Sequence, residues 1–317
     1  MSTVLILAPP TDDHAPAVIA ELERQGGQYV TLDLAGFPQS IALAMAYEGR
    51  QRSFRLTEGL RLDLDEIGSI WWRRPGSPTV SAEIVRPSHR QFAANESDQA
   101  LSGLWQAVDA FWINEPKRDE IGHRKPLQLR VAQDVGLAVP DTLITNDPTE
   151  ARAFIERYGP RRVIFKSFSA TQSEWRETRL LGQAELAVIE HVRFAPVIFQ
   201  EYIEAVCDLR ITVVGERIFP AAIYSAPDAY PIDFRMDMGH ARVEPAILPP
   251  EVSDGLLALM RRLGLVYGAI DVRLTPEGRY VFLEVNPAGQ WLFIEQVTGQ
   301  PIAAEIARCL VAGGVAA

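Results

Sequence analysis

Two acidic side chains and one amide near the C-terminus offer the clearest chemistry in this sequence. Asp271 lies in the run AIDVRL, and Glu284 and Asn286 lie in the later run YVFLEVNP. Both runs alternate apolar with polar residues, which is typical of half-buried strands. The four residues between them, TPEG, favour a tight turn, so the sequence predicts a β-hairpin that carries all three side chains.

The predicted turn sets which residues of the hairpin face each other. A register that pairs Pro276 with Arg279 also places Asp271 directly opposite Glu284. Opposed residues have Cβ atoms roughly 4.5–5.5 Å apart. Asn286 is two residues beyond Glu284, on the same face of its strand. Two carboxylates and an amide oxygen are therefore expected to converge on one small volume.

Carboxylates at that distance favour a bound cation. Like charges so close together destabilise each other unless something positive lies between them. Hard oxygen ligands on a rigid hairpin suit Mg²⁺, which commonly takes carboxylates together with substrate phosphates. The pattern thus predicts Mg²⁺ and a nucleoside triphosphate. The alternative is that these acids lie on a solvated strand face, but YVFLEVNP is mostly apolar, which argues against exposure to water. A slip of one residue in the strand register would move Asp271 to the opposite face of the hairpin.

Two lysines stand where a lone positive charge is unfavourable. Lys166 interrupts the apolar strand VIFKSF, and Lys125 opens a predicted helix, where its charge opposes the helix dipole. An anion such as a phosphate would offset both costs. Each signal is weak alone, because a lysine that carries its charge from a strand end into water is equally common.

The run FQEYIEAVCDLR reads as a strand, a polar bend and a second strand. Glu201 and the backbone after it are candidates for binding an adenine edge and a ribose. Asp208 and Arg210 alternate onto one face of the second strand. Arg235, in the loop PIDFRMD, is a further candidate, although an arginine in such a loop is more often solvated.

Arg73 and Arg74 follow two tryptophans in the run SIWWRRP. Because side chains alternate along a strand, one of the two arginines is expected to face solvent or a cleft. Tryptophans packed on the long helix, with the arginine heads reaching water, explain the run equally well.

Composition limits the class of protein. The 317 residues carry 31 basic and 41 acidic side chains, a net charge of −10, which argues against a general nucleic-acid or membrane-surface binder. Cys207 and Cys309 have no metal-type spacing, and free thiols fit a reducing compartment. The opening MSTVLILAPP has no basic segment, and no apolar run reaches the roughly 18 residues of a membrane span. We expect a cytoplasmic chain.

The order of elements predicts an α/β fold in three units. A strand, a helix and a second strand open the chain, and a long helix over 87–110 and the strand FWIN close a first α/β unit. Mixed α+β units follow, with one helix expected over 183–194. The predicted units are 1–118, 119–198 and 199–317, with the acidic hairpin in the last.

With these residues assembled, the chain resembles the ATP-grasp superfamily of carboxylate–amine and carboxylate–alcohol ligases. The likeness lies in the order of the series Lys125, Lys166, QEYI at 200–203, Asp208, Arg235, Asp271, Glu284 and Asn286. The N-terminal part, with SIWWRRP and KPLQLRVAQDVGLAVPDTLITNDP, looks like the microviridin-type peptide maturases, also called graspetide synthetases. The resemblance covers nearly the whole chain.

The resemblance implies an ATP-grasp fold, with an N-terminal α/β pre-ATP-grasp domain and two α+β lobes that sandwich ATP. In such enzymes a carboxylate is phosphorylated to an acyl phosphate, and a nucleophile then displaces the phosphate. In graspetide synthetases the carboxylate is an Asp or Glu side chain of a ribosomal precursor peptide. A Ser, Thr or Lys side chain of that peptide closes an ester or amide macrocycle.

The resemblance also implies roles for single residues. ATP contacts are expected from Lys125, Lys166, Glu201, Tyr202, Ile203 and Asp208, and Mg²⁺ ligands from Asp271, Glu284 and Asn286. Arg210 and Arg235 are expected to stabilise the transferring phosphoryl group or the incoming carboxylate. Candidates for binding the substrate are Arg73, Arg74 and Arg273. One departure is that the loop 167–179 has no glycine, whereas phosphate-covering loops use glycine for close backbone approach.

The partner that the resemblance implies is a precursor peptide with leader and core. A homodimer is also expected. Neither nucleic acid nor a membrane is expected as a partner. Two other hypotheses stay open. One is an ATP-grasp ligase that joins an amino acid or amine to a small carboxylate or a protein tail. The other is a non-catalytic nucleotide-binding protein, against which the complete series of acids and lysines argues.

Overall fold

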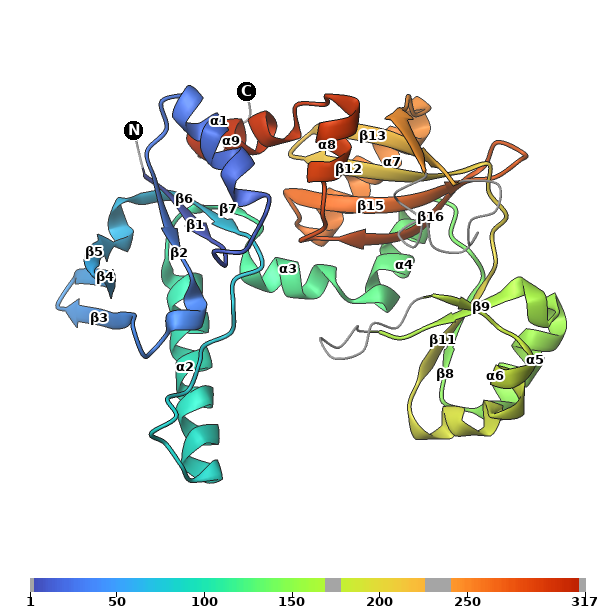
Figure 1. Ribbon diagram of the computed structural model, residues 1–317, viewed down its shortest axis with the longest axis horizontal. Coiled ribbons are helices and arrows are strands. Elements are labelled where there is room, and N and C mark those ends of the chain that lie inside the picture. The colour runs from blue at the N-terminus through green and yellow to red at the C-terminus, as the bar shows by residue number, and fades with distance from the viewer. Residues whose placement is uncertain (1–2, 169–177, 226–240, 314–317) are drawn as a thin grey trace.

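The computed structural model describes residues 3–168, 178–225 and 241–313, and it begins with an α/β domain built on a parallel sheet (Figure 1). The sheet has the order β2-β1-β6-β7, with β1 Thr3–Leu7, β2 Tyr29–Leu32, β6 Ile67–Trp72 and β7 Phe111–Ile113. Helices α1 Ala15–Arg24 and α2 Pro87–Ala107 belong to this domain. A small antiparallel sheet adjoins it, formed by β3 Ala42–Glu48, β4 Gln51–Glu58 and β5 Leu60–Asp63, with short 3₁₀ turns at η1 Leu34–Gly36 and η2 Leu64–Glu66.

The first strand shows why this sheet is buried on both faces. In β1, Val4 and Ile6 pack into the cluster that contains α1, whereas Leu5 and Leu7 pack into the cluster that contains α2. Side chains alternate along a strand, so an uninterrupted apolar run supplies both layers at once.

The central lobe has an antiparallel sheet and a core of its own. The sheet order is β10-β9-β11-β8, with β8 Thr142–Thr145, β9 Val163–Lys166, β10 Arg179–Leu180 and β11 Val197–Glu201. The helical segments are α5 Pro148–Tyr158, η3 Pro160–Arg162, α6 Gln183–Ala187 and η4 Ile189–Phe194. Asp147 caps α5 by accepting a hydrogen bond from the Thr149 N–H over 2.8 Å, as the Asp-Pro pair predicts.

The C-terminal lobe holds a five-stranded antiparallel sheet in the order β14-β13-β12-β15-β16. Its strands are β12 Cys207–Val214, β13 Arg217–Tyr224, β14 Arg242–Pro245, β15 Tyr267–Leu274 and β16 Tyr280–Asn286. One face packs on α4 Lys125–Asp134 and α7 Pro250–Leu263. The other packs on α8 Leu292–Thr298 and α9 Ile302–Ala312, and α9 lies beside α1 of the first domain (Figure 1). The first domain and this sheet therefore share one apolar core.

Three helical features differ from the sequence-based expectation. The helix expected over 183–194 is two short pieces, α6 and η4, because β-branched Val188 and Ile189 disfavour a continuous α-helix. The helices α3 Pro116–Gly122 and α8 have no counterpart in the prediction. None of the helices in the described part of the chain is long and apolar enough to cross a membrane.

Candidate active site

The carboxylate hairpin, formed by β15 and β16, places Asp271 directly opposite Glu284. This predicted pairing is confirmed. Each acid has a basic partner from another element: Arg210 Nη1 lies 2.7 Å from Asp271 Oδ1, and Lys125 Nζ pairs with Glu284 Oε2. The Asp271 and Glu284 side chains keep 15% and 25% of their surface exposed, so both remain accessible to a ligand.

The hairpin reaches this pairing by a different route from the predicted one. At the turn, the Thr275 N–H donates to the Arg279 carbonyl over 2.9 Å, so the expected pairing of Pro276 with Arg279 is wrong. The register then shifts by one residue at Leu283, which falls between two successive pairs of the ladder. A β-bulge of this kind bends the strand and re-aims neighbouring side chains. Here it brings Glu284 back into register with its acidic partner.

Asn286 completes the set of oxygen donors on this hairpin. It lies two residues beyond Glu284, and its Oδ1 accepts a hydrogen bond from the Ala288 N–H over 3.0 Å. An amide oxygen has two lone pairs, so this bond leaves one for another partner. No cluster of three or more His, Cys, Asp or Glu arranged for a metal occurs among the described residues. Two carboxylates and an amide oxygen nevertheless form a donor set that suits Mg²⁺ when phosphate oxygens complete its shell.

Two buried amides hold the carboxylate hairpin in place. Gln128, on α4, accepts from the Val285 N–H over 3.0 Å and donates to the Val285 carbonyl over 2.8 Å. Asn114, just after β7, accepts from the Tyr267 N–H over 2.8 Å and donates to the Pro287 carbonyl over 3.0 Å. Both amides are 2% exposed. Because they bind backbone at the end of the hairpin opposite its turn, close to both acids, they hold the two acids before any ligand binds.

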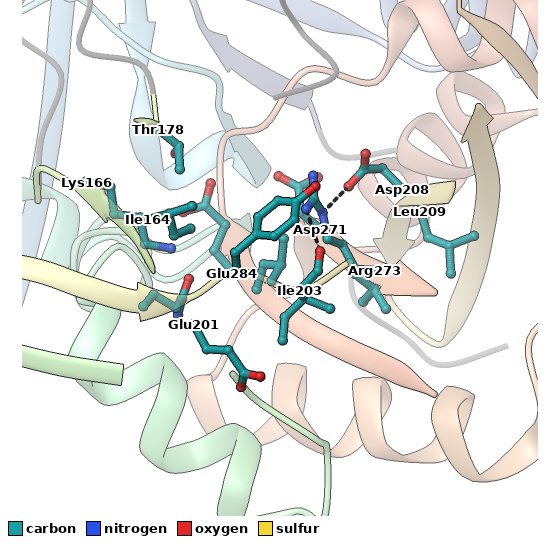
Figure 2. A pocket seen from close by; sticks show the side chains of 14 residues that line it. Ile164, Lys166, Thr178, Glu201, Ile203, Asp208, Leu209, Asp271, Arg273 and Glu284 are labelled. Atoms are coloured by element: carbon teal, nitrogen blue, oxygen red, sulfur yellow. Dashed lines mark hydrogen bonds and ion pairs between the residues drawn. The ribbon is translucent and has the colours of Figure 1, made fainter. Parts of the chain in front are cut away.

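A pocket that is open to solvent lies between the central lobe and this hairpin (Figure 2). The central lobe and the segment after it contribute Ile164, Lys166, Thr178, Gln200, Glu201, Tyr202 and Ile203. The C-terminal lobe contributes Asp208, Leu209, Asp271, Val272, Arg273, Leu283 and Glu284. Aliphatic side chains from both lobes, with a lysine and acids beside them, suit a ligand that has a flat ring and an anionic tail.

The hinge, residues 201–206, connects β11 to β12 and is fastened by Arg273. The Arg273 Nε lies 2.9 Å from Asp208 Oδ1, and its Nη1 donates to the Ile203 carbonyl over 2.7 Å (Figure 2). Its guanidinium carbon lies 5.5 Å from the centre of the Tyr202 ring, within reach of a cation–π contact. Arg273 is 5% exposed, so it is part of the pocket wall. Figure 2 shows the Glu201 carboxylate directed away from the other labelled side chains.

Arg73 and Arg74 connect the first domain to the segment that follows the carboxylate hairpin. Arg73 is 2% exposed; its Nε lies 3.0 Å from Asp12 Oδ2, and its Nη1 donates to the Ala288 carbonyl over 2.9 Å. Arg74 donates from Nε to the same carbonyl over 2.7 Å. Its backbone has a φ of 48°, a strained value that persists only where the surroundings fix it. The first domain therefore holds the segment that directly follows the carboxylate hairpin.

Arg210 is a buried cation beside the acidic pair. Burial would lower the pKa of its guanidinium, but the adjoining Asp271 carboxylate outweighs burial and raises it. Its Nη2 also donates to the Gln290 carbonyl over 3.0 Å. A Cβ on Gly289 would lie 2.3 Å from the Ala269 Cβ and 3.1 Å from Arg210 Nη2, so this close approach requires glycine.

Some expected site residues cannot be placed, and some placed residues were not expected. Arg235 and the stretch 169–177 of the glycine-free loop lie outside the described residues. Asn114 and Gln128 carry no signal in the sequence that would mark them. Gln200 does carry one, because it is a polar residue within the apolar strand VIFQ.

Two family models together match almost the whole chain. The MvdD pre-ATP grasp domain matches residues 3–120, and the RimK-like ATP-grasp domain matches residues 123–310. Among curated relatives, the probable α-L-glutamate ligase 2 of Shewanella amazonensis is 28% identical over 212 residues, which are 65% of this chain and 67% of the relative.

Solved structures extend the likeness over both domains. The macrocyclase MdnC of Microcystis aeruginosa, solved with its precursor peptide MdnA, has a TM-score of 0.88 and 30% identity, and the match covers 98% of this chain and 100% of that one. A RiPP-associated ATP-grasp ligase of Chryseobacterium gregarium, solved with ADP and a leader and core peptide, has a TM-score of 0.89 and 25% identity over 98% and 97% of the two chains. The RimK-like model alone spans more than half of the residues of this chain, so the chain belongs to the RimK-like ATP-grasp family of ligases.

Proposed function

We propose that this chain is an ATP-dependent ligase that closes macrocycles within a ribosomal precursor peptide. The observation that carries the proposal is the full-length likeness to the macrocyclase MdnC, which covers the N-terminal domain as well as the catalytic lobes. The pocket supports it, because acids, a lysine and a hinge gather around one volume, as phosphoryl transfer requires.

ATP would bind in the pocket between the two lobes. We assign its base to the hinge, through Glu201, Tyr202 and Ile203, and its ribose side to Asp208. Lys166 would hold phosphates, and Lys125, which pairs with Glu284 in the structure, would exchange that carboxylate for a phosphate. Asp271, Glu284 and Asn286 would hold Mg²⁺, which when bound offsets negative charge on the phosphates.

The reaction begins when an oxygen of a peptide carboxylate attacks the terminal phosphorus of ATP. The bond from that phosphorus to ADP breaks, and an acyl phosphate forms. Arg210 and Arg235 would stabilise the charge on the transferring phosphoryl group and the incoming carboxylate. A hydroxyl or amine of the same peptide then attacks the acyl carbon, loses its proton and expels phosphate. Because both groups belong to one peptide, their effective concentration is high.

The three candidate substrate-binding arginines have different surroundings. Arg73 and Arg273 are buried and bonded within the chain, so we propose that they position the site. Arg74 lies at the surface, so it remains the candidate for direct contact with the peptide. We further propose functional units at 1–118, 119–198 and 199–317, a homodimeric assembly, and action in the cytoplasm on a peptide with leader and core.

The experiment is ligation of a candidate precursor peptide. The neighbouring reading frames are searched for a short one rich in Thr, Ser, Asp and Glu, and its peptide is incubated with the chain, ATP and Mg²⁺. We expect ADP and phosphate, together with peptide that is lighter by one water for each bond formed. Production of AMP and pyrophosphate would contradict the assignment.

A second candidate function is addition of glutamate to a carboxylate, favoured by the likeness to α-L-glutamate ligases. That likeness covers 65% of this chain for the Shewanella ligase and 82% for a second α-L-glutamate ligase, whereas the likeness to MdnC covers 98%. In the same mass-spectrometric assay, with glutamate added, this activity would make the acceptor heavier by one glutamate residue. Water loss without added amino acid would support the macrocyclase.

A further inference from the structure

A second pocket, which we call the domain pocket, lies between the first domain and α3. Its walls are the segment 75–78, one face of α2, and α3 with the residues at its two ends. Figure 1 shows α3 running from the first domain towards α4. None of the residues assigned above to ATP or Mg²⁺ lines this pocket.

The domain pocket adjoins the reaction site along two of its walls. The segment 75–78 follows directly on Arg74, whose Nε donates to the Ala288 carbonyl just beyond the carboxylate hairpin. The α3 wall leads within a few residues to Lys125, which pairs with Glu284. A peptide whose carboxylate reaches the hairpin can therefore continue into this pocket.

An aromatic wall of the domain pocket carries an unused hydrogen-bond donor. Trp72 and Trp105 both line the pocket, and their ring centres lie 6.2 Å apart. Trp105 is 4% exposed, and within the described part of the chain its indole N–H has no acceptor. A buried indole N–H usually finds an acceptor, so a ligand that fills the pocket is expected to supply one.

The charged side chains of the domain pocket are mostly acidic. Four acids, one lysine and one histidine line it: Asp98, Glu115, Asp119, Glu120, Lys117 and His123. Glu115 accepts from two N–H groups at the start of α3, and Glu120 pairs with Arg124. Asp119 is 6% exposed, and its ion-pair partner is His123 at 3.2 Å, which is charged only when protonated. A buried carboxylate is costly without a positive charge beside it, so the pocket favours a cation.

We propose that the domain pocket binds an arginine side chain of the precursor peptide, close to the residue whose carboxylate is activated. The flat guanidinium would stack on the partly buried Trp72 ring and pair with the Asp119 carboxylate. A backbone carbonyl of the same peptide segment would accept from the Trp105 N–H. The inference rests on the proposed function in taking a precursor peptide as the substrate. It adds an anchor that takes no part in ring closure.

The test follows the indole N–H signals of the nitrogen-labelled chain by NMR, since the chain has only six tryptophans. The probes are acetyl-Gly-Arg-Gly-amide and the same tripeptide with citrulline, which keeps the shape of arginine without its charge. The Trp105 signal, identified by its loss in Trp105→Phe, should move saturably with the arginine tripeptide. The citrulline tripeptide should bind about tenfold more weakly, because it forms no charge-assisted contact.

Asp119→Asn tests the carboxylate. The change is nearly isosteric, and the preference for arginine over citrulline should fall to about twofold. Glu96→Gln, exposed on α2 outside the domain pocket, is the control and should keep the wild-type preference.

The wild-type comparison decides even if a variant does not fold. A Trp105 signal that stays in place, or that moves equally with both tripeptides, would overturn the inference. A chain that binds the arginine tripeptide as predicted but closes no ring would keep the arginine site and remove the macrocyclase proposal. Ring closure without this binding would do the reverse.

Discussion

The two walls of the pocket are held in place in different ways. The carboxylate hairpin belongs to a sheet that packs against an apolar cluster on each face. It also accepts side-chain hydrogen bonds from Asn114, Gln128 and Arg210. The opposite wall, β9 and β11, belongs to the central lobe, whose core is a separate cluster. The hinge joins the two walls, and Arg273 ties it to the C-terminal sheet. The wall that carries the two acids is thus built rigidly, while the wall formed by β9 and β11 is positioned through the hinge.

This difference matches what each wall is proposed to do. Charge that develops during phosphoryl transfer is best stabilised by groups that need no rearrangement, which requires a rigid support. A nucleotide must also enter and leave, which is easier if the wall formed by β9 and β11 can separate from the wall that carries the acids. Variants in the two walls should therefore change different kinetic constants.

The largest effect is expected at the rigid wall, from Glu284→Gln. The change is nearly isosteric, so the fold should persist, but loss of one charged metal ligand should slow turnover by on the order of 100-fold. Steady-state rates at saturating Mg²⁺ measure the loss. Glu277→Gln, at the exposed turn of the same hairpin, is the matched control and should behave as wild type. Near-normal turnover of Glu284→Gln would exclude this residue as a ligand.

Gln128→Met tests whether the buried amides support the acids. It leaves the Val285 N–H and carbonyl without partners, which should lower the free energy of unfolding by about 1–3 kcal/mol. Turnover should fall by roughly tenfold with ADP affinity almost unchanged, because the acids move but the hinge does not. Chemical denaturation and calorimetry measure the two effects. Gln133→Met, exposed on the same helix, is the control; a loss confined to ADP affinity would contradict the assignment.

Arg273→Lys tests the hinge. A lysine keeps the charge but has one nitrogen, so it cannot hold Asp208 and the Ile203 carbonyl together as the guanidinium does. ADP should bind about tenfold more weakly, while the rate at saturating nucleotide changes little. Hydrogen exchange of the 201–206 amides should also rise in the nucleotide-free chain. Arg279→Lys, exposed on the same hairpin, is the control. A raised KM for peptide with normal ADP affinity would instead mean that Arg273 contacts substrate.

The smallest effect on turnover is expected at the junction of the first domain with the rigid wall, where the prediction concerns stability. The Trp291 N–H donates to His14 Nε2 over 3.2 Å, and burial, together with the charge of Arg73, lowers the pKa of His14 from 6.5 to about 4. Between pH 6.5 and pH 4 the His14 imidazole is therefore mostly protonated in the unfolded chain and mostly neutral in the folded chain. The free energy of unfolding should therefore fall by up to about 3 kcal/mol as the pH drops from 6.5 to 4.

His14→Gln provides the comparison for that pH dependence. Glutamine can still accept from the Trp291 N–H but does not titrate, so its unfolding free energy should decline less over the same range. Denaturant titrations at several pH values measure the difference between the two chains. Parallel curves for the wild type and the variant would show that His14 does not carry the effect.

The sequence predicted the acid pair better than it predicted what supports it. Alternating polarity located the two strands, because strand periodicity is a local property, and Asp271 does face Glu284 although the predicted turn is wrong. The bulge at Leu283 was missed, since it compensates for a turn one residue different from the expected one. Asn114 and Gln128 were missed because their partners lie more than 150 residues away along the chain. Contacts of that range depend on how the domains pack, which periodicity does not encode.

The central claim is that this rigid acidic wall activates a peptide carboxylate as an acyl phosphate. The most direct measurement uses a precursor peptide whose Asp and Glu carboxylates are enriched in heavy oxygen, incubated with the chain, ATP and Mg²⁺. When the ring closes, the phosphate released should carry one heavy oxygen atom from the peptide for each bond formed, while ADP stays unlabelled. Heavy oxygen in AMP, or rings formed with unlabelled phosphate, would contradict the account.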